Sequence, residues 1–130
     1  DCLVVDLPPG TADAPLTVMQ TLPLDGFIVV TTPQELARLD AVRSINMIRR
    51  MNLTVLGIVE NFSGPIFGSG AGEDVARETG LPFLGRFEMR ADYRDSGTPA
   101  VLTSPAVAEE YAAVLKRLRE RLDSLRSPTA

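Results

Sequence analysis

The 130-residue sequence contains no histidine, no tryptophan and a single cysteine, and these absences exclude several kinds of chemistry. Without histidine there is no histidine acid/base catalysis, no Ser-His-Asp or Cys-His nucleophile, and no place for most zinc sites. Cys2 alone cannot form an internal disulfide or a Cys-x-x-Cys metal site. Because Cys2 lies in an apolar stretch, we expect an inert thiol in the core.

Long apolar runs and positive charge are also lacking. No run approaches the roughly 20 apolar residues of a membrane-spanning helix, and the first residues have no basic start of a signal peptide. The net charge of −4 and the pI near 4.8 disfavour nucleic-acid binding. We therefore expect a soluble, cytoplasmic protein that binds neither nucleic acid nor membrane.

What is present is a series of short apolar runs rich in valine and isoleucine, at residues 3–6, 27–31 and 55–59. Such runs predict strands that are buried on both faces. Between the second and third runs, residues 33–51 carry apolar side chains at helical spacing, which predicts an amphipathic helix. Strand, helix and strand in this order form a βαβ unit, so the fold class is α/β with a mainly parallel sheet.

A second unit follows the first. Residues 73–79 are predicted as a helix that ends at Gly80, residues 82–87 as a strand, and residues 105–126 as a final helix. We expect one domain over residues 1–130 with a frayed tail at 127–130. Because its second to fifth residues already resemble a buried strand, we expect the chain to be part of a longer domain.

The first predicted strand ends in an acid, Asp6, followed by Leu-Pro-Pro and Gly10. Ligands of open α/β sheets bind at the carboxyl ends of the strands. An acid there can hold Mg²⁺ through a water, and a glycine amide can approach a terminal phosphate. The bland alternative is a helix-capping Asp6 before an ordinary Pro-Pro-Gly turn. The complete string favours a Walker B and switch segment.

Residues 6–13 resemble the DLPPGTGD segment of the Mrp-type ATPases, the iron–sulfur cluster carriers related to MinD and ParA. Segments that resemble further signatures of this family follow in order at residues 31–34, 39–41, 45–47, 56–61, 66–68 and 81–85. The resemblance covers about the first hundred residues. It implies a three-layer P-loop NTPase domain of the Rossmann-like kind.

The resemblance also implies roles for single residues. Asp6 would be the acid on the Mg²⁺ side, Gly10 would face the γ-phosphate, and Asn61 would hydrogen-bond adenine. Pro82 would lie on the adenine side, and Asp40 would face the partner subunit. The implied cofactors are ATP and Mg²⁺, and the implied partners are a second copy of the chain and iron–sulfur client proteins.

The sequence departs from the family at the phosphate site. Lys116 is its single lysine, and no Gly-Lys-Ser/Thr occurs anywhere. A Walker A loop is therefore absent, and we predict that this chain alone does not hydrolyse ATP. In the family the P-loop strand lies beside the Walker B strand, so we expect a gap in the sheet unless an upstream segment fills it or the sheet rearranges.

Two further departures affect the cluster and the base. The family carries a Cys-x-x-Cys pair between the equivalents of residues 61–63 and 66–68, where only Gly64 and Pro65 lie here. The usual cluster ligands are thus absent. At residues 87–90 the sequence Phe-Glu-Met-Arg replaces the family's Ile-Pro-x-Asp, which shapes the adenine pocket.

Two segments have competing interpretations. The glycine run at residues 68–72 fits a plain flexible loop better than an anion-binding helix start. The final helix has an apolar stripe that we expect to dock on the sheet, although MinD-like relatives use such a helix on membranes. The stripe comprises Tyr111, Val114, Leu115, Leu118, Leu122 and Leu125.

Three functions remain open from the sequence. The first is an ATP-dependent iron–sulfur cluster carrier of the Mrp family, represented by its carboxyl-terminal part. The second is a non-catalytic paralogue or interaction module, which the missing lysine would suit. The third is a positioning ATPase like MinD or ParA, which the missing cysteines mildly favour.

Overall fold

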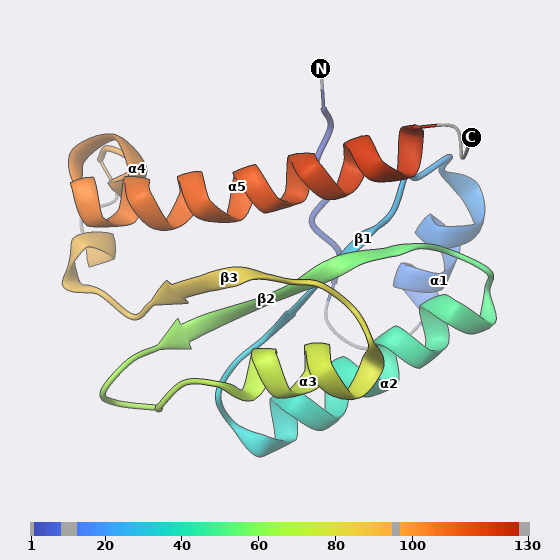
Figure 1. The fold of residues 1–130 in the computed structure, drawn as a ribbon, viewed down its shortest axis with the longest axis horizontal. Coiled ribbons are helices and arrows are strands. Elements are labelled where there is room, and N and C mark those ends of the chain that lie inside the picture. The colour runs from blue at the N-terminus through green and yellow to red at the C-terminus, as the bar shows by residue number, and fades with distance from the viewer. Residues whose placement is uncertain (1, 9–12, 95–96, 128–130) are drawn as a thin grey trace.

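A three-stranded parallel sheet forms the centre of the computed structural model, which describes residues 2–8, 13–94 and 97–127. The strands are β1 (Phe27–Thr31), β2 (Val55–Ser63) and β3 (Phe83–Glu88), and they lie side by side in that order. The crossovers are α2 (Glu35–Arg50) and α3 (Ala71–Thr79). The predicted α/β class with a parallel sheet is confirmed (Figure 1).

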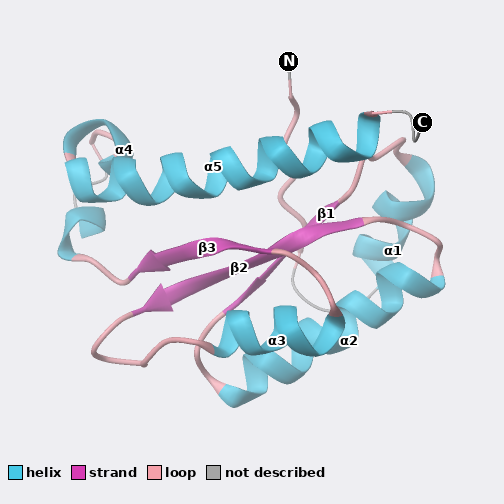
Figure 2. Cartoon of the chain, viewed as in Figure 1, coloured by secondary structure: helices cyan, strands magenta, loops and turns pink. Residues whose placement is uncertain are grey.

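Helices cover the two faces of the sheet. Helices α2 and α3 lie on one face, and α5 (Pro105–Arg126) crosses the other (Figure 2). Three shorter elements complete the described chain: α1 (Asp13–Thr21), the 3₁₀ turn η1 (Ala91–Arg94) and α4 (Ala100–Thr103). Sequence reasoning did not predict these three. No helix in the described ranges is long and apolar enough to span a bilayer.

The core has two parts, one on each face of the sheet. On the α2 and α3 side, Ile45, Ile58 and Val75 are fully buried. On the α5 side, Leu84 and Val59 pack against Val114. Since β2 contributes to both parts, its residues 55–60 are all buried, as the continuous apolar run predicted.

Local signals fix the element ends. Gly80 ends α3 in the left-handed conformation (φ 68°), as predicted. Ser104 caps α5, where its hydroxyl accepts from the amide of Val107, and Pro105 fills the first turn. Helix α2 begins at Glu35 rather than at residue 33 because Gln34 is still extended (φ −73°, ψ 138°).

The prediction of a buried strand at residues 3–6 is wrong. Residues 2–8 form no strand, and Leu3 and Val4 are 87% and 81% exposed. A strand needs neighbours for its backbone N–H and C=O groups, and the ladders of this sheet join only β1, β2 and β3. Cys2, expected in the core, is exposed for the same reason.

Helix α5 confirms its predicted bounds, residues 105–126, but only part of its predicted stripe. It packs on β3 and β2 through Val114 and the partly buried Leu118. Leu115 and Leu125 are exposed, so they do not dock on the sheet.

Candidate pocket at the strand ends

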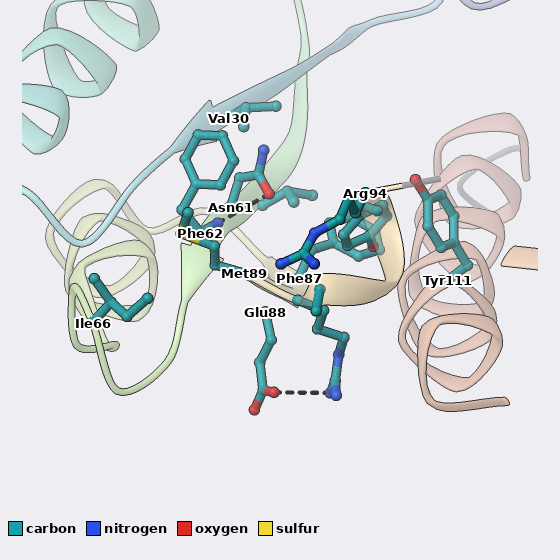
Figure 3. Close-up of a pocket in the computed structure, with 13 residues that line it drawn as sticks. Val30, Asn61, Phe62, Ile66, Phe87, Glu88, Met89, Arg94 and Tyr111 are labelled. Atoms are coloured by element: carbon teal, nitrogen blue, oxygen red, sulfur yellow. Dashed lines mark hydrogen bonds and ion pairs between the residues drawn. The ribbon is translucent and has the colours of Figure 1, made fainter. Parts of the chain in front are cut away.

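A pocket of about 740 Å³ opens where the three strands end. Val30 of β1, Asn61 of β2 and Glu88 of β3 all reach it, so it lies at the carboxyl edge of the sheet, where α/β proteins bind ligands (Figure 3). Its lining residues are Val30, Val59, Asn61, Phe62, Ile66, Phe87, Glu88, Met89, Arg90, Ala91, Tyr93, Arg94 and Tyr111.

Aromatic rings form one wall of this pocket. The rings of Phe87 and Tyr111 are 4.6 Å apart between centroids and tilted by 43°, which joins β3 to α5. Tyr93 of η1 lines the same pocket, and burial raises the pKa of its hydroxyl. This tyrosine therefore stays protonated at neutral pH.

Asn61 is held by its own chain. Its Oδ1 accepts a hydrogen bond from the Phe62 amide at 2.9 Å. Phe62 has a left-handed backbone (φ 57°), which is unfavourable for a bulky residue and commonly marks a functional position. The Nδ2 of Asn61 donates to no residue within the ranges 2–8, 13–94 and 97–127.

Charged side chains surround the pocket mouth. The Nη2 of Arg90 lies 2.9 Å from Glu88 and 2.8 Å from Glu110, and the hydrogen bond that Arg90 donates to Glu110 raises the pKa of Arg90. Arg94 also lines the pocket, and it forms no ion pair with any residue in the ranges 2–8, 13–94 and 97–127. The pocket therefore contains one guanidinium, that of Arg90, held by two carboxylates, and a second, that of Arg94, with no acid partner among the described residues.

Behind the pocket lies a buried carboxylate, Glu60, which is fully inaccessible to solvent. It accepts from the amides of Gly72 (2.8 Å) and Gly70 (3.0 Å) and from the hydroxyl of Ser63 (2.6 Å). Burial raises the pKa of this carboxyl, but these three hydrogen bonds and the charge of Arg86 together hold it below its usual range.

The same contacts explain the glycine run before α3. Its backbone amides do bind an anion, but that anion is the side chain of Glu60. Gly72 is required at this position because a Cβ there would lie 2.9 Å from the Cβ of Glu60 and 2.9 Å from the Phe83 ring. The glycine run therefore anchors the loop between β2 and α3 to the carboxylate of Glu60.

The family model described as NUBPL iron-transfer P-loop NTPase, of the ParA type, matches residues 1–122. The chain belongs to this family. An iron–sulfur cluster carrier protein from Methanocaldococcus jannaschii is 42% identical over 137 residues, which cover 95% of the chain and 47% of that relative. The chain thus spans less than half the length of this curated relative.

Solved structures agree with the family on the fold. The MinD protein of Pyrococcus horikoshii, complexed with Mg-ADP, superposes with a TM-score of 0.70 at 22% identity, over 96% of this chain and 51% of that one. A nucleotide-binding protein from Archaeoglobus fulgidus in complex with ADP gives 0.58 at 30% identity, over 94% and 46%. The predicted relation to Mrp-type and MinD-type proteins is confirmed.

The pocket contains few of the site residues that the sequence predicted. Asn61 lines it, whereas Asp6 is exposed and does not. Gly10 falls outside the described residues. Asp40 is exposed on α2, where it pairs with Arg43 at 3.1 Å.

Pro82 precedes β3 at the opposite end of that strand from the pocket, and its carbonyl accepts from the amide of Ile58 at 2.9 Å. In place of Pro82, Met89 and the aromatic wall line the pocket. Sequence reasoning missed Phe62, Tyr93, Arg94 and Tyr111. Their one shared signal was position, since Phe62 is the last residue but one of β2 and the others lie beyond β3.

Proposed function

We propose that this chain supplies the Walker B segment and the base pocket of an iron–sulfur cluster carrier that binds and hydrolyses a purine nucleotide. The observation that carries the proposal is Asn61, the predicted base-binding residue, in an aromatic pocket at the carboxyl edge of a parallel sheet. The M. jannaschii relative carries the name of iron–sulfur cluster carrier, and the A. fulgidus neighbour is bound to ADP.

The phosphate end of the nucleotide would lie toward Asp6 and Gly10, by the resemblance already described, and the resemblance names the nucleotide as ATP with Mg²⁺. Asp6 is exposed, and no three His, Cys, Asp or Glu side chains within the described ranges converge on a possible metal position. In this proposal the metal arrives with the phosphates.

A Walker A lysine must come from outside these 130 residues, because Lys116, the single lysine, is on α5. Strand β1 offers a place for the strand that carries it. It is an edge of the described sheet, where the ladders pair β1 with β2 on one side. A parallel strand could pair with the backbone N–H and C=O groups on the other side of β1 and end at the same edge as the pocket.

The iron–sulfur cluster is the cargo of the proposed carrier. Since the described residues contain no cluster of metal ligands, we propose that the ligands lie in another segment or in the client protein. A homodimer with Asp40 toward the partner subunit is part of the proposal, and the exposure of Asp40 on α2 is compatible with it.

The test is a calorimetric titration with Mg-ATP of two proteins. One is this chain, and the other is a chimera in which the P-loop half of the M. jannaschii relative precedes it. We expect little affinity for the chain and both binding and hydrolysis for the chimera, with hydrolysis lost in Asp6→Asn. A matched Asp25→Asn chimera should keep its activity, since Asp25 lies in the turn before β1.

Three results would count against the proposal. Tight Mg-ATP binding by the chain alone would contradict the need for an external lysine. A folded chimera that binds no nucleotide would remove the nucleotide assignment. Binding of the chain to anionic vesicles would instead favour a positioning ATPase.

A further inference from the structure

Residues 88–94, here called the rim segment, supply more of the pocket lining than any other segment of the described chain. They comprise the last residue of β3 and the 3₁₀ turn η1, with the two residues between them. The sequence at residues 87–90 is also where the chain departs from its family. The shape of this side of the pocket therefore depends on contacts that this chain makes for itself.

Glu110 of α5 holds the first part of the rim segment. Its Oε1 accepts from Nη2 (2.8 Å) and Nε (3.2 Å) of Arg90 and from the backbone amide of Glu88 (3.3 Å). The side chains of Arg90 and Glu110 are 25% and 15% exposed, so water and salt screen this ion pair weakly. Three donors of the rim segment thus converge on one carboxylate oxygen of α5.

The second oxygen of Glu110 shows that packing alone does not explain this residue. Oε2 is buried and accepts from no residue within the ranges 2–8, 13–94 and 97–127. A buried acceptor without a donor costs free energy. The glutamate at this position is therefore explained by the groups that its Oε1 holds rather than by a favourable place in the interior.

Two further contacts fix the rim segment on either side of Arg90. The amide of Met89 donates to the carbonyl of Ser63 in β2 at 2.9 Å. The side chain of Ser104, the cap of α5, hydrogen-bonds the carboxylate of Asp92 and lowers the pKa of that carboxyl. Helix α5 and strand β2 therefore hold the rim segment at successive residues.

Glu110 does not itself line the pocket, although its neighbour Tyr111 does (Figure 3). Any effect of Glu110 on a bound nucleotide must therefore pass through the residues that it holds. A binding wall that is fixed before the ligand arrives lowers the cost of ordering it on binding. We infer that Glu110 is a positioning residue for the base, which it serves by fixing Arg90 and the end of β3. This inference rests on the proposed nucleotide function and adds a residue of α5 to its base pocket.

The first measurement tests the contact in this chain alone. Amide hydrogen exchange of ¹⁵N-labelled wild type and Glu110→Gln is compared by NMR. We expect the amides of Glu88 and Met89 to exchange about tenfold faster in the variant, the factor that the loss of one charge-assisted hydrogen bond gives. Glu109→Gln, the same change at the exposed neighbouring position, is the control and should keep the wild-type rates.

The second measurement tests whether the contact serves the base. The chimera with the P-loop half of the M. jannaschii relative is assayed for ATP hydrolysis with and without Glu110→Gln. A looser rim segment weakens binding of the ground state and the transition state alike, so we expect KM for ATP to rise about tenfold with kcat nearly unchanged. A purely structural role would lower kcat with the folded fraction and leave KM as it is. Glu109→Gln should change neither constant.

Arg90→Met removes the same pair from the other side and keeps the test available if Glu110→Gln does not fold. It should raise KM at least as much, and the double variant should raise KM no further than Arg90→Met alone. Arg90→Lys keeps one charged hydrogen bond and should recover part of the affinity. Arg50→Met, at an exposed position on α2, is the control for the loss of an arginine.

The outcomes distinguish this inference from the proposed function. If KM is unchanged in Glu110→Gln, or if the effects of the two single variants multiply in the double variant, the positioning role is wrong while the nucleotide pocket stands. A raised KM without faster exchange at Glu88 and Met89 would also overturn it, because Glu110 would then act by another route. If the wild-type chimera binds no ATP, the proposed function and this inference both fall.

Discussion

Two stretches of this chain have nearly the same sequence pattern and opposite structures. Residues 3–6 and residues 56–60 are both short apolar runs that end in an acid. The second run lies in β2 with its acid, Glu60, fully buried, while the first stays outside the sheet with Asp6 exposed. The same pattern therefore does not by itself make a buried strand.

The difference lies in what surrounds each run. Strand β2 has β1 on one side and β3 on the other, so its backbone groups are paired along both edges. Glu60 can remain charged in the interior because two backbone amides and a hydroxyl donate to it. Neither a strand ladder nor such donors reach residues 3–6 in the described chain.

The largest effect should come from removing the Glu60 carboxylate. Glu60→Ala leaves the amides of Gly70 and Gly72 without a partner beside a new cavity, so we expect a loss of about 3 kcal/mol in the free energy of unfolding. Urea denaturation measures it. Glu78→Ala is the control, since its exposed pair with Arg38 should contribute less than about 1 kcal/mol. Equal losses in the two variants would mean that Glu60 does not anchor the loop.

A smaller effect should follow acidification. Because the folded state lowers the pKa of Glu60, this residue contributes stability above its unfolded pKa of about 4.3, and the contribution is lost as the pH falls through the lower folded value. We expect the stability difference between wild type and Glu60→Gln to shrink toward acid pH. Acidification should cost the wild type less free energy of unfolding than Glu60→Ala does, since a protonated carboxyl still accepts some of these hydrogen bonds.

The measurement is urea unfolding of both proteins between neutral pH and about pH 3. The pKa values of Glu35 and Asp92 are also lowered in the folded state, so both proteins become less stable in acid. Subtracting the pH dependence of the free energy of unfolding of Glu60→Gln from that of the wild type leaves the contribution of Glu60. A difference that stays constant with pH would show that Glu60 does not titrate as described.

Local sequence patterns were sufficient for elements whose signals lie within their own residues. The bounds predicted for β1 and α5 agree with the structure, because a valine-rich run and a proline in the first turn of a helix are signals within a few positions. The strand at residues 3–6 failed because pairing depends on a distant partner. Helix α1 was missed because its nine residues carry only a short apolar pattern.

The pocket shows the same limit. Asn61 was found because it ends a predicted strand inside a recognisable motif. Arg94 and Tyr111 come from η1 and α5, and their approach to Asn61 depends on how α5 crosses the sheet, which no local pattern records. The hydrogen bond from the Phe62 amide to Asn61 and the left-handed backbone at Phe62 were equally absent from any local pattern.

The smallest effect should come from the first run. Leu3→Ala should change the free energy of unfolding of this chain by less than about 0.5 kcal/mol because Leu3 is exposed. The matched change in the second run, Leu56→Ala, removes a buried side chain that belongs to neither of the two core clusters, so it should cost about 2 kcal/mol, the lower end of the range for buried leucines. The comparison becomes sharper in the chimera with a P-loop half. If a strand beside β1 gives residues 3–6 a partner, Leu3→Ala should then approach the cost of Leu56→Ala. A large loss already in the chain alone would show that the first run is buried without such a partner.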